Sequence, residues 1–156
     1  MAIADRLHHY MQRKGVHFDV VAHAPTMTSS ATAQAAHIPG VRVAKPVVIH
    51  HEMGFLVAVV PSTHRVELST LQELLDRRLG LATEAEITTL FTDCQLGAIP
   101  PIGAAYGVPV MLDDSLADAT DLYFEGGDHT SLIHVSGQAF RMLTNDARHG
   151  RFSHPA

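Results

Sequence analysis

Hydrophobic residues follow a helical spacing at the start of this chain. Ile3, Leu7, Tyr10 and Met11 are separated by four, three and one positions, and Lys14-Gly15 follows them. This spacing puts the apolar side chains on one helix face, and glycine is a common residue at a helix end. The pattern predicts an amphipathic first helix.

The next residues predict a strand and a second helix. Phe18 to Ala22 is typical of a short strand. Three hydroxyl residues at 28–30 offer N-cap oxygens for an alanine-rich helix over 31–37, which Pro39-Gly40 would end. The small side chains of that helix allow close packing.

The middle of the chain predicts a hairpin followed by two helices. The runs Pro46 to Ile49 and Phe55 to Val60 are apolar on both faces, so we expect two paired and buried strands. Ser69-x-x-Gln72 and Thr83-x-x-Glu86 match the capping-box pattern and predict two helix starts. We expect these helices to face inward through Leu71, Leu74, Leu75, Ile87, Leu90 and Phe91.

The second half predicts a loop, short strands and a last helix. A loop rich in glycine and proline runs over 97–109, and Asp113 is suited to cap a short helix. Ser136 would cap a helix carrying Phe140 and Leu143. The expected strands lie at 108–112, 122–124 and 131–135. We expect the tail from Arg148, and 149–156 in particular, to be flexible.

Length and composition fit one globular domain. The 156 residues are 46% hydrophobic and 17% charged, which is enough to bury a single core. With the order of elements, this predicts an α/β (α+β) fold over 1–156, in which helices surround a mixed, curved β-sheet.

Neither a membrane span nor a disulfide is expected. The longest strictly apolar run has six residues, Phe55 to Val60, whereas a membrane helix needs about 20. Charged Asp5 and Arg6 stand where a secretory signal would be apolar, and Cys94 is the single cysteine. We therefore expect a cytoplasmic protein without a membrane partner.

Charge is distributed unevenly along the chain. The formal net charge is -5, and residues 81–140 hold nine Asp and Glu but no Lys or Arg. A nucleic acid would have to approach through the first 80 residues or the C-terminal tail, because the acidic stretch repels phosphates. We expect no DNA binding.

Common catalytic and metal motifs are missing. The histidine pairs His8-His9 and His50-His51 are adjacent, so their side chains diverge on a helix or strand and do not form a zinc site. The sequence has no Gly-x-Ser-x-Gly elbow, Walker loop or dinucleotide-binding glycine motif. We expect no metal or cofactor, while a triad of dispersed Ser, His and Asp stays open.

Lys45 is an unusual cation, because it opens an apolar strand between Ala44 and Pro46. The other lysine, Lys14, lies at a helix end where a solvated cation is favourable. Lys45 either extends its ammonium to solvent or is held to polarise a carbonyl or bind an anion. The residues alone leave both interpretations open.

Two glycine motifs are candidate ligand loops. Gly97-Ala-Ile-Pro-Pro-Ile-Gly103 combines rigid prolines with permissive glycines, so it could aim backbone groups at a ligand or simply form a tight turn. Gly126-Gly127 precedes His129, which could face the same cavity or be a hydrogen-bonded loop residue.

Together these features resemble the YbaK-type, prolyl-tRNA synthetase-associated domain family over residues 16–143. The resemblance rests on Phe18 and His23 before the small helix, Lys45, Gly97-x-x-Pro-Pro-x-Gly103, Asp113-x-x-Leu116 and Gly126-Gly127. It implies the family's fold and a trans-editing aminoacyl-tRNA deacylase. The implied partners are the acceptor end of an aminoacyl-tRNA and an aminoacyl-tRNA synthetase.

The resemblance also implies residue roles. Lys45 corresponds to the lysine expected near the scissile ester and terminal adenosine, and Gly97 with Pro100 to the loop lining the aminoacyl pocket. With backbone donors at Gly97 and Ala98, Lys45 would stabilise charge on the carbonyl, while loop carbonyls would hold the α-ammonium. The other implied substrate contacts are Phe18, Thr26, Ser30, Gly127 and His129.

Pro46 departs from the family pattern, in which a residue with a backbone N–H and a polar side chain more often follows the lysine. Either the pocket suits a different amino acid or activity is reduced. Three alternatives therefore stand beside the deacylase: a non-catalytic aminoacyl- or nucleotide-binding module, a small-molecule esterase or amidase using the same lysine, and a protein that serves interactions only.

Overall fold

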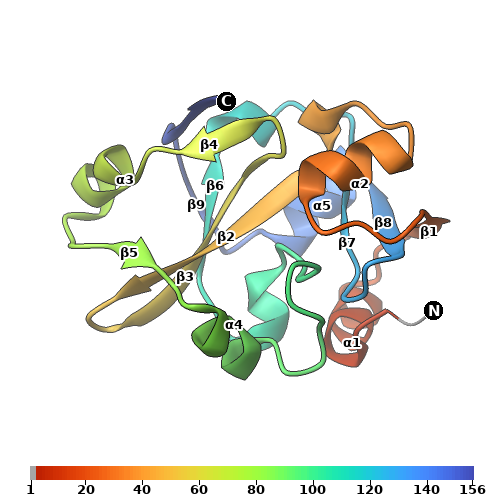
Figure 1. Ribbon diagram of the computed structural model, residues 1–156, viewed down its shortest axis with the longest axis horizontal. Helices are drawn as coiled ribbons and strands as arrows, with labels where there is room; N and C mark the ends of the chain where they lie inside the picture. The colour runs from red at the N-terminus through yellow and green to blue at the C-terminus, as the bar shows by residue number, and fades with distance from the viewer. Residues whose placement is uncertain (1–2) are drawn as a thin grey trace.

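The computed structural model describes residues 3–156 and has a mixed α/β fold, which confirms the predicted class (Figure 1). A central five-stranded sheet runs through the molecule in the order β5-β2-β3-β6-β9. Its strands are β5 (Gly80–Leu81), β2 (Ala44–His51), β3 (Gly54–Pro61), β6 (Val110–Asp113) and β9 (Arg148–Gly150). The β2-β3 hairpin is antiparallel, as predicted, whereas β3 pairs with β6, and β6 with β9, in parallel.

The remaining strands form a second sheet and a two-stranded ribbon, although the sequence pattern predicted one sheet. The second sheet, in the order β1-β8-β7, is antiparallel and consists of β1 (Asp19–Ala22), β8 (Ser131–Ser136) and β7 (Asp121–Glu125). The ribbon pairs β10 (Ser153–Pro155) with β4 (His64–Val66).

The helices lie around these sheets (Figure 1). They are α1 (Asp5–Lys14), α2 (Ser29–Ala35), α3 (Leu68–Leu75), α4 (Glu84–Leu90) and α5 (Gly137–Leu143), with short 3-10 turns η1 (Gly40–Arg42), η2 (Gly103–Tyr106) and η3 (Asp114–Leu116). The side chains of Thr28, Thr83, Asp113 and Ser136 accept capping hydrogen bonds, as predicted. No helix within residues 3–156 is long and apolar enough to cross a membrane.

One predicted capping box is wrong. Helix α3 begins at Leu68, so Ser69 lies inside its first turn, and Glu67 takes the N-cap position without a side-chain capping bond. The Glu67 N–H donates to the Phe152 carbonyl at 2.6 Å, which fixes the chain two residues before the predicted cap. Leu74 of this helix is 44% exposed, contrary to the predicted inward orientation.

The C-terminal tail is paired, contrary to its predicted flexibility. Strand β9 joins the central sheet and β10 joins the ribbon. Between them, Phe152 is fully buried, and its N–H donates to Asp113 Oδ1 at 2.9 Å. The tail is rich in basic and polar residues, so its composition alone does not reveal that Phe152 anchors it.

The β2-β3 hairpin separates two cores. Alternate residues such as Val48 and Val57 pack into a large core with α1, α5 and the second sheet. Residues of opposite parity, such as Ile49 and Val60, pack into a smaller core with α3. Burial of both faces explains why these strands lack polar alternation.

Candidate functional site

A pocket of about 290 Å³ lies between β2, α4 and the loop that follows α4. Most of its wall is apolar, with two polar side chains, Ser29 and Glu125. The full lining is Ser29, Pro46, Val47, Val48, Leu81, Ala82, Ile87, Leu96, Gly97, Ile99 and Glu125. Two of the features that the sequence singled out, Gly97 and Pro46, therefore share one cavity.

Gly97 combines a constrained backbone with a crowded neighbourhood. Its φ of +87° favours glycine, and a Cβ here would lie 3.1 Å from His129 Cε1 and 3.5 Å from the Met27 carbonyl oxygen. Within residues 3–156 no hydrogen bond occupies the Gly97 N–H. This N–H is therefore a free donor at the pocket wall.

Ala98 does not offer a second donor. It is fully buried, and its N–H donates to the Gln95 carbonyl at 3.0 Å. The expected pair of backbone donors at Gly97 and Ala98 is therefore reduced to one, because the turn at residues 95–98 uses the second N–H for its own closure.

His129 lies next to Gly97, but it lines a neighbouring groove and not the pocket that Gly97 lines. Its Nδ1 is 2.8 Å from the Thr26 carbonyl oxygen. A carbonyl only accepts, so Nδ1 carries the proton and Nε2 is left on the side of Gly97, 4.0 Å from the Cβ position. Thr26 thus contributes to the site by orienting His129.

Gly127 contacts the segment that leads into Gly97. Its carbonyl accepts from the Gln95 N–H at 2.8 Å, and a Cβ on this residue would lie 2.8 Å from the Ala4 Cβ. Gly127 and His129 line an open groove beside the pocket, together with Met27 and Gln95. The glycine pair therefore joins the N-terminal segment, the Gly97 loop and the groove.

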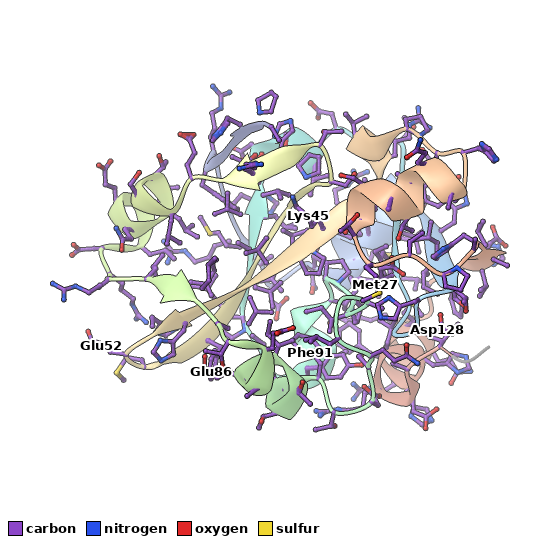
Figure 2. All side chains as sticks on the ribbon, in the orientation of Figure 1. Met27, Lys45, Glu52, Glu86, Phe91 and Asp128 are labelled. Carbon is purple, nitrogen blue, oxygen red and sulfur yellow. The ribbon has the colours of Figure 1, made fainter. Side chains whose placement is uncertain are left out.

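Lys45 is close in sequence to the pocket but is not part of its lining. Its Nζ donates to the His64 carbonyl at 2.6 Å, on the β4 side of the hairpin. Burial, with a further contribution from the Arg65 charge, lowers the pKa of the Lys45 ammonium. In the view of Figure 2, Met27 lies between Lys45 and Asp128, and Met27 and Asp128 line the same groove.

Three other expected contacts lie outside the pocket. Phe18 packs edge-on against His8, with ring centroids 5.9 Å apart. Ser30 donates to the Ser62 carbonyl at 3.2 Å, while its neighbour Ser29 lines the pocket. Pro100 is buried within the loop. None of these three residues is part of the pocket lining.

A buried carboxylate in the wall was missed by sequence reasoning. Glu125 is 3% exposed, and its Oε2 accepts from the Thr32 hydroxyl at 2.7 Å. Burial raises the pKa of the Glu125 carboxyl. Its position at the end of an apolar strand, directly before Gly126-Gly127, was the available signal.

Neither a cysteine nucleophile nor a metal cluster is found. Burial raises the pKa of Cys94 to about 12, so its thiol stays protonated at neutral pH. Among the residues that the structure describes, no group of three His, Cys, Asp or Glu side chains could hold a metal ion.

The fold and the pocket define a class of protein: a small α/β domain whose apolar cavity, of amino-acid size, carries one free backbone donor. The model of the aminoacyl-tRNA editing domain family matches residues 23–143. The chain belongs to this family, and its function is related to aminoacyl-tRNA editing.

Solved structures share this fold along nearly the whole chain. A candidate trans-editing enzyme for prolyl-tRNA synthetase has a TM-score of 0.84 and 24% identity, covering 97% of this chain and 96% of its own. Hypothetical protein APE2540 has a TM-score of 0.84 and 19% identity, with 96% and 100% covered. A candidate signal transduction protein from Marinobacter aquaeolei VT8 has a TM-score of 0.79 and 16% identity, covering 95% of this chain and 30% of its own. No curated protein matches the chain.

Proposed function

We propose that this protein is an aminoacyl-tRNA deacylase, which hydrolyses the ester between a mischarged amino acid and the terminal ribose of tRNA. The observation that carries the proposal is the free Gly97 N–H in the wall of an apolar pocket of amino-acid size. Membership of the editing-domain family supports it. So does the likeness in fold to a candidate trans-editing enzyme for prolyl-tRNA synthetase.

The proposed reaction needs no nucleophilic side chain, because an aminoacyl ester is already reactive. The oxygen of a water molecule bonds to the carbonyl carbon, the carbon–ribose oxygen bond breaks, and a proton from the water ends on the ribose oxygen. The Gly97 N–H donates to the carbonyl oxygen as negative charge develops there. The neighbouring ribose hydroxyl orients the water, so positioning supplies most of the rate.

Lys45 would act on the nucleotide side of the ester. Its ammonium has three N–H donors, and the His64 carbonyl uses one of them. The remaining donors, with Arg65 nearby, form a positive region at the start of β2 that suits the acceptor end of tRNA. We therefore propose that Lys45 contacts the terminal ribose or phosphate beside the ester.

The pocket favours an amino acid with an apolar side chain. Most of its lining is apolar, and Pro46 has no N–H to offer a polar group. A synthetase discriminates poorly between small apolar side chains, so a second protein that removes the error is physically sensible. The proposal implies a cytoplasmic protein that works alongside the synthetase responsible for the error.

The test is deacylation of tRNAs charged with Ala, Ser, Thr, Cys or Pro by the native protein, Lys45→Ala and Lys14→Ala. Lys14 is the matched control, because it is the only other lysine and its Nζ contacts Asn145 at 3.4 Å on the surface. We expect turnover of one species, about a hundredfold slower in Lys45→Ala and unchanged in Lys14→Ala.

Other outcomes would assign a different function. A folded protein that binds charged tRNA without turnover is a binding module, and the missing donor at Pro46 would explain it. Hydrolysis of simple aminoacyl esters at the same rate without tRNA indicates a small-molecule esterase. Equal loss in both lysine variants would refute the role of Lys45.

A further inference from the structure

A chain of hydrogen bonds runs from the pocket wall to His129. The Thr32 hydroxyl donates to Glu125 Oε2 at 2.7 Å, and the Thr26 and Thr32 hydroxyls are hydrogen-bonded to each other. The Thr26 carbonyl accepts from His129 Nδ1 at 2.8 Å. Four residues from four separate segments are therefore joined in one network.

The direction of each bond follows from the acceptor at its end. Because Thr32 gives its proton to the Glu125 carboxyl, its oxygen must accept from the Thr26 hydroxyl. Thr26 then donates its hydroxyl proton to Thr32, and its carbonyl accepts from His129. Turning the Thr32 hydroxyl toward Thr26 would take this donor away from Glu125 Oε2.

The segment that carries Thr26 has few other attachments. Within residues 3–156, residues 25–27 make no hydrogen bond besides the two of Thr26. Pro25 and Met27 are exposed, Met27 by 71%. The orientation of the Thr26 carbonyl, and hence of His129, therefore depends on Thr32.

Thr32 in turn is held rigidly. It is fully buried in α2, and its partner Glu125 is 3% exposed. The other carboxyl oxygen, Oε1, faces His23 Nε2 at 3.7 Å, and neither atom has a hydrogen-bond partner among the described residues. His23 Nδ1 is 2.7 Å from the Ala24 carbonyl oxygen, so Nδ1 carries a proton and Nε2 is free to accept one from Oε1.

We propose that Thr32 and Glu125 are positioning residues, which act through Thr26 to hold His129 in its Nδ1–H form against Gly97. This inference rests on the proposed function only in that His129 then presents Nε2 to the substrate beside the Gly97 N–H. Neither residue touches the substrate in this role. Both act by fixing the ring and its tautomer.

The experiment uses two matched pairs of variants. Thr32→Val removes the hydroxyl at nearly constant volume, and Thr32→Ser keeps it. Glu125→Met removes the acceptor, whereas Glu125→Gln keeps an oxygen for Thr32 and offers an N–H to His23 Nε2. Urea unfolding of each full-length variant shows whether it is folded.

The first readout is the nitrogen NMR spectrum of His129, assigned with His129→Ala, and it does not depend on activity. We expect the Nδ1–H tautomer to dominate in the native protein, Thr32→Ser and Glu125→Gln, and to lose population in Thr32→Val and Glu125→Met. An unchanged tautomer in a folded Thr32→Val protein would overturn the proposal, whatever the enzyme does.

The second readout is deacylation kinetics. We expect kcat to fall about tenfold in Thr32→Val, with KM within about twofold, and Thr32→Ser to restore it. In the Thr32→Val/His129→Ala double variant the loss should equal that of His129→Ala alone, because both changes remove the same contact. Losses that multiply would overturn the positioning role. Absence of turnover in the native protein would refute the deacylase proposal and leave the NMR result as the test of this one.

Discussion

Gly97 and His129 approach so closely that a methyl group on residue 97 would lie 3.1 Å from Cε1 of the imidazole. The contact joins the loop after α4 to the turn between β7 and β8. It also leaves the free Gly97 N–H in the wall of the pocket and the His129 ring in the groove beside it. The absence of a side chain at position 97 is therefore a requirement of the site as well as of the backbone.

Gly97→Ala should lower both stability and activity. The φ of +87° alone costs an alanine about 1 kcal/mol, and the new Cβ must also displace His129. Gly107→Ala is the control, because it has a φ of +70° but nothing within 4 Å of the Cβ position. Urea unfolding should show a similar backbone cost in both variants, while deacylation should fall only in Gly97→Ala. Equal activity in the two would contradict the role of the contact.

Pro46→Ala should increase deacylation. The change adds a backbone N–H to β2 beside the pocket, where a donor can stabilise charge on the carbonyl. We expect a gain of about tenfold in kcat with the preferred substrate, measured by single-turnover deacylation. Pro61→Ala, at the end of β3, is the control for replacing a strand proline, because it lies outside the lining of the pocket. A loss of activity in Pro46→Ala would mean that the rigid ring shapes the pocket.

Stability should depend on pH through Glu125. Its pKa is raised by burial, with a smaller contribution from Asp128, while the Thr32 hydrogen bond and, to a lesser extent, His23 and His129 oppose the shift. A raised carboxyl pKa means that the folded state binds the proton more tightly than the unfolded state does. The resulting stabilisation is present below the unfolded pKa of about 4.5 and is lost as pH rises through the folded value.

Glu125→Gln tests this dependence because it removes the titrating group. The free energy of unfolding of the native protein, relative to this variant, should decrease between about pH 4.5 and neutrality. Urea titrations at several pH values measure it. A constant difference across that range would show that Glu125 titrates at the same pH in the folded and unfolded states.

Phe152→Ala should destabilise the protein by about 3 kcal/mol, because the ring is fully buried in the smaller core. Met142→Ala is the comparison, since Met142 is 42% exposed and should cost little. Thermal or urea unfolding of the two variants measures the difference. A small effect in Phe152→Ala would mean that β9 and β10 contribute little to the folded state.

Local patterns in the sequence predicted the elements well where the determining interactions are local. The Thr83 capping box and the Ser136 cap are confirmed, because a side chain and a backbone N–H three residues apart decide them. The apolar runs of the β2-β3 hairpin predicted burial of both faces, because apolar residues on each face of the hairpin need a core to pack into. The resemblance to an editing domain rested on similar short motifs.

Only the tertiary structure decided the rest. The predicted Ser69 capping box and the predicted flexible tail were both wrong for the same reason. Glu67 and Phe152, which are far apart in the chain, are in contact. The site likewise depends on long-range pairs: His129 with Thr26, Thr32 with Glu125, and Lys45 with the His64 carbonyl. Sequence alone pointed to Lys45, Gly97 and His129 as candidate site residues. Which of them meet depends on how distant segments pack, and local spacing does not encode that.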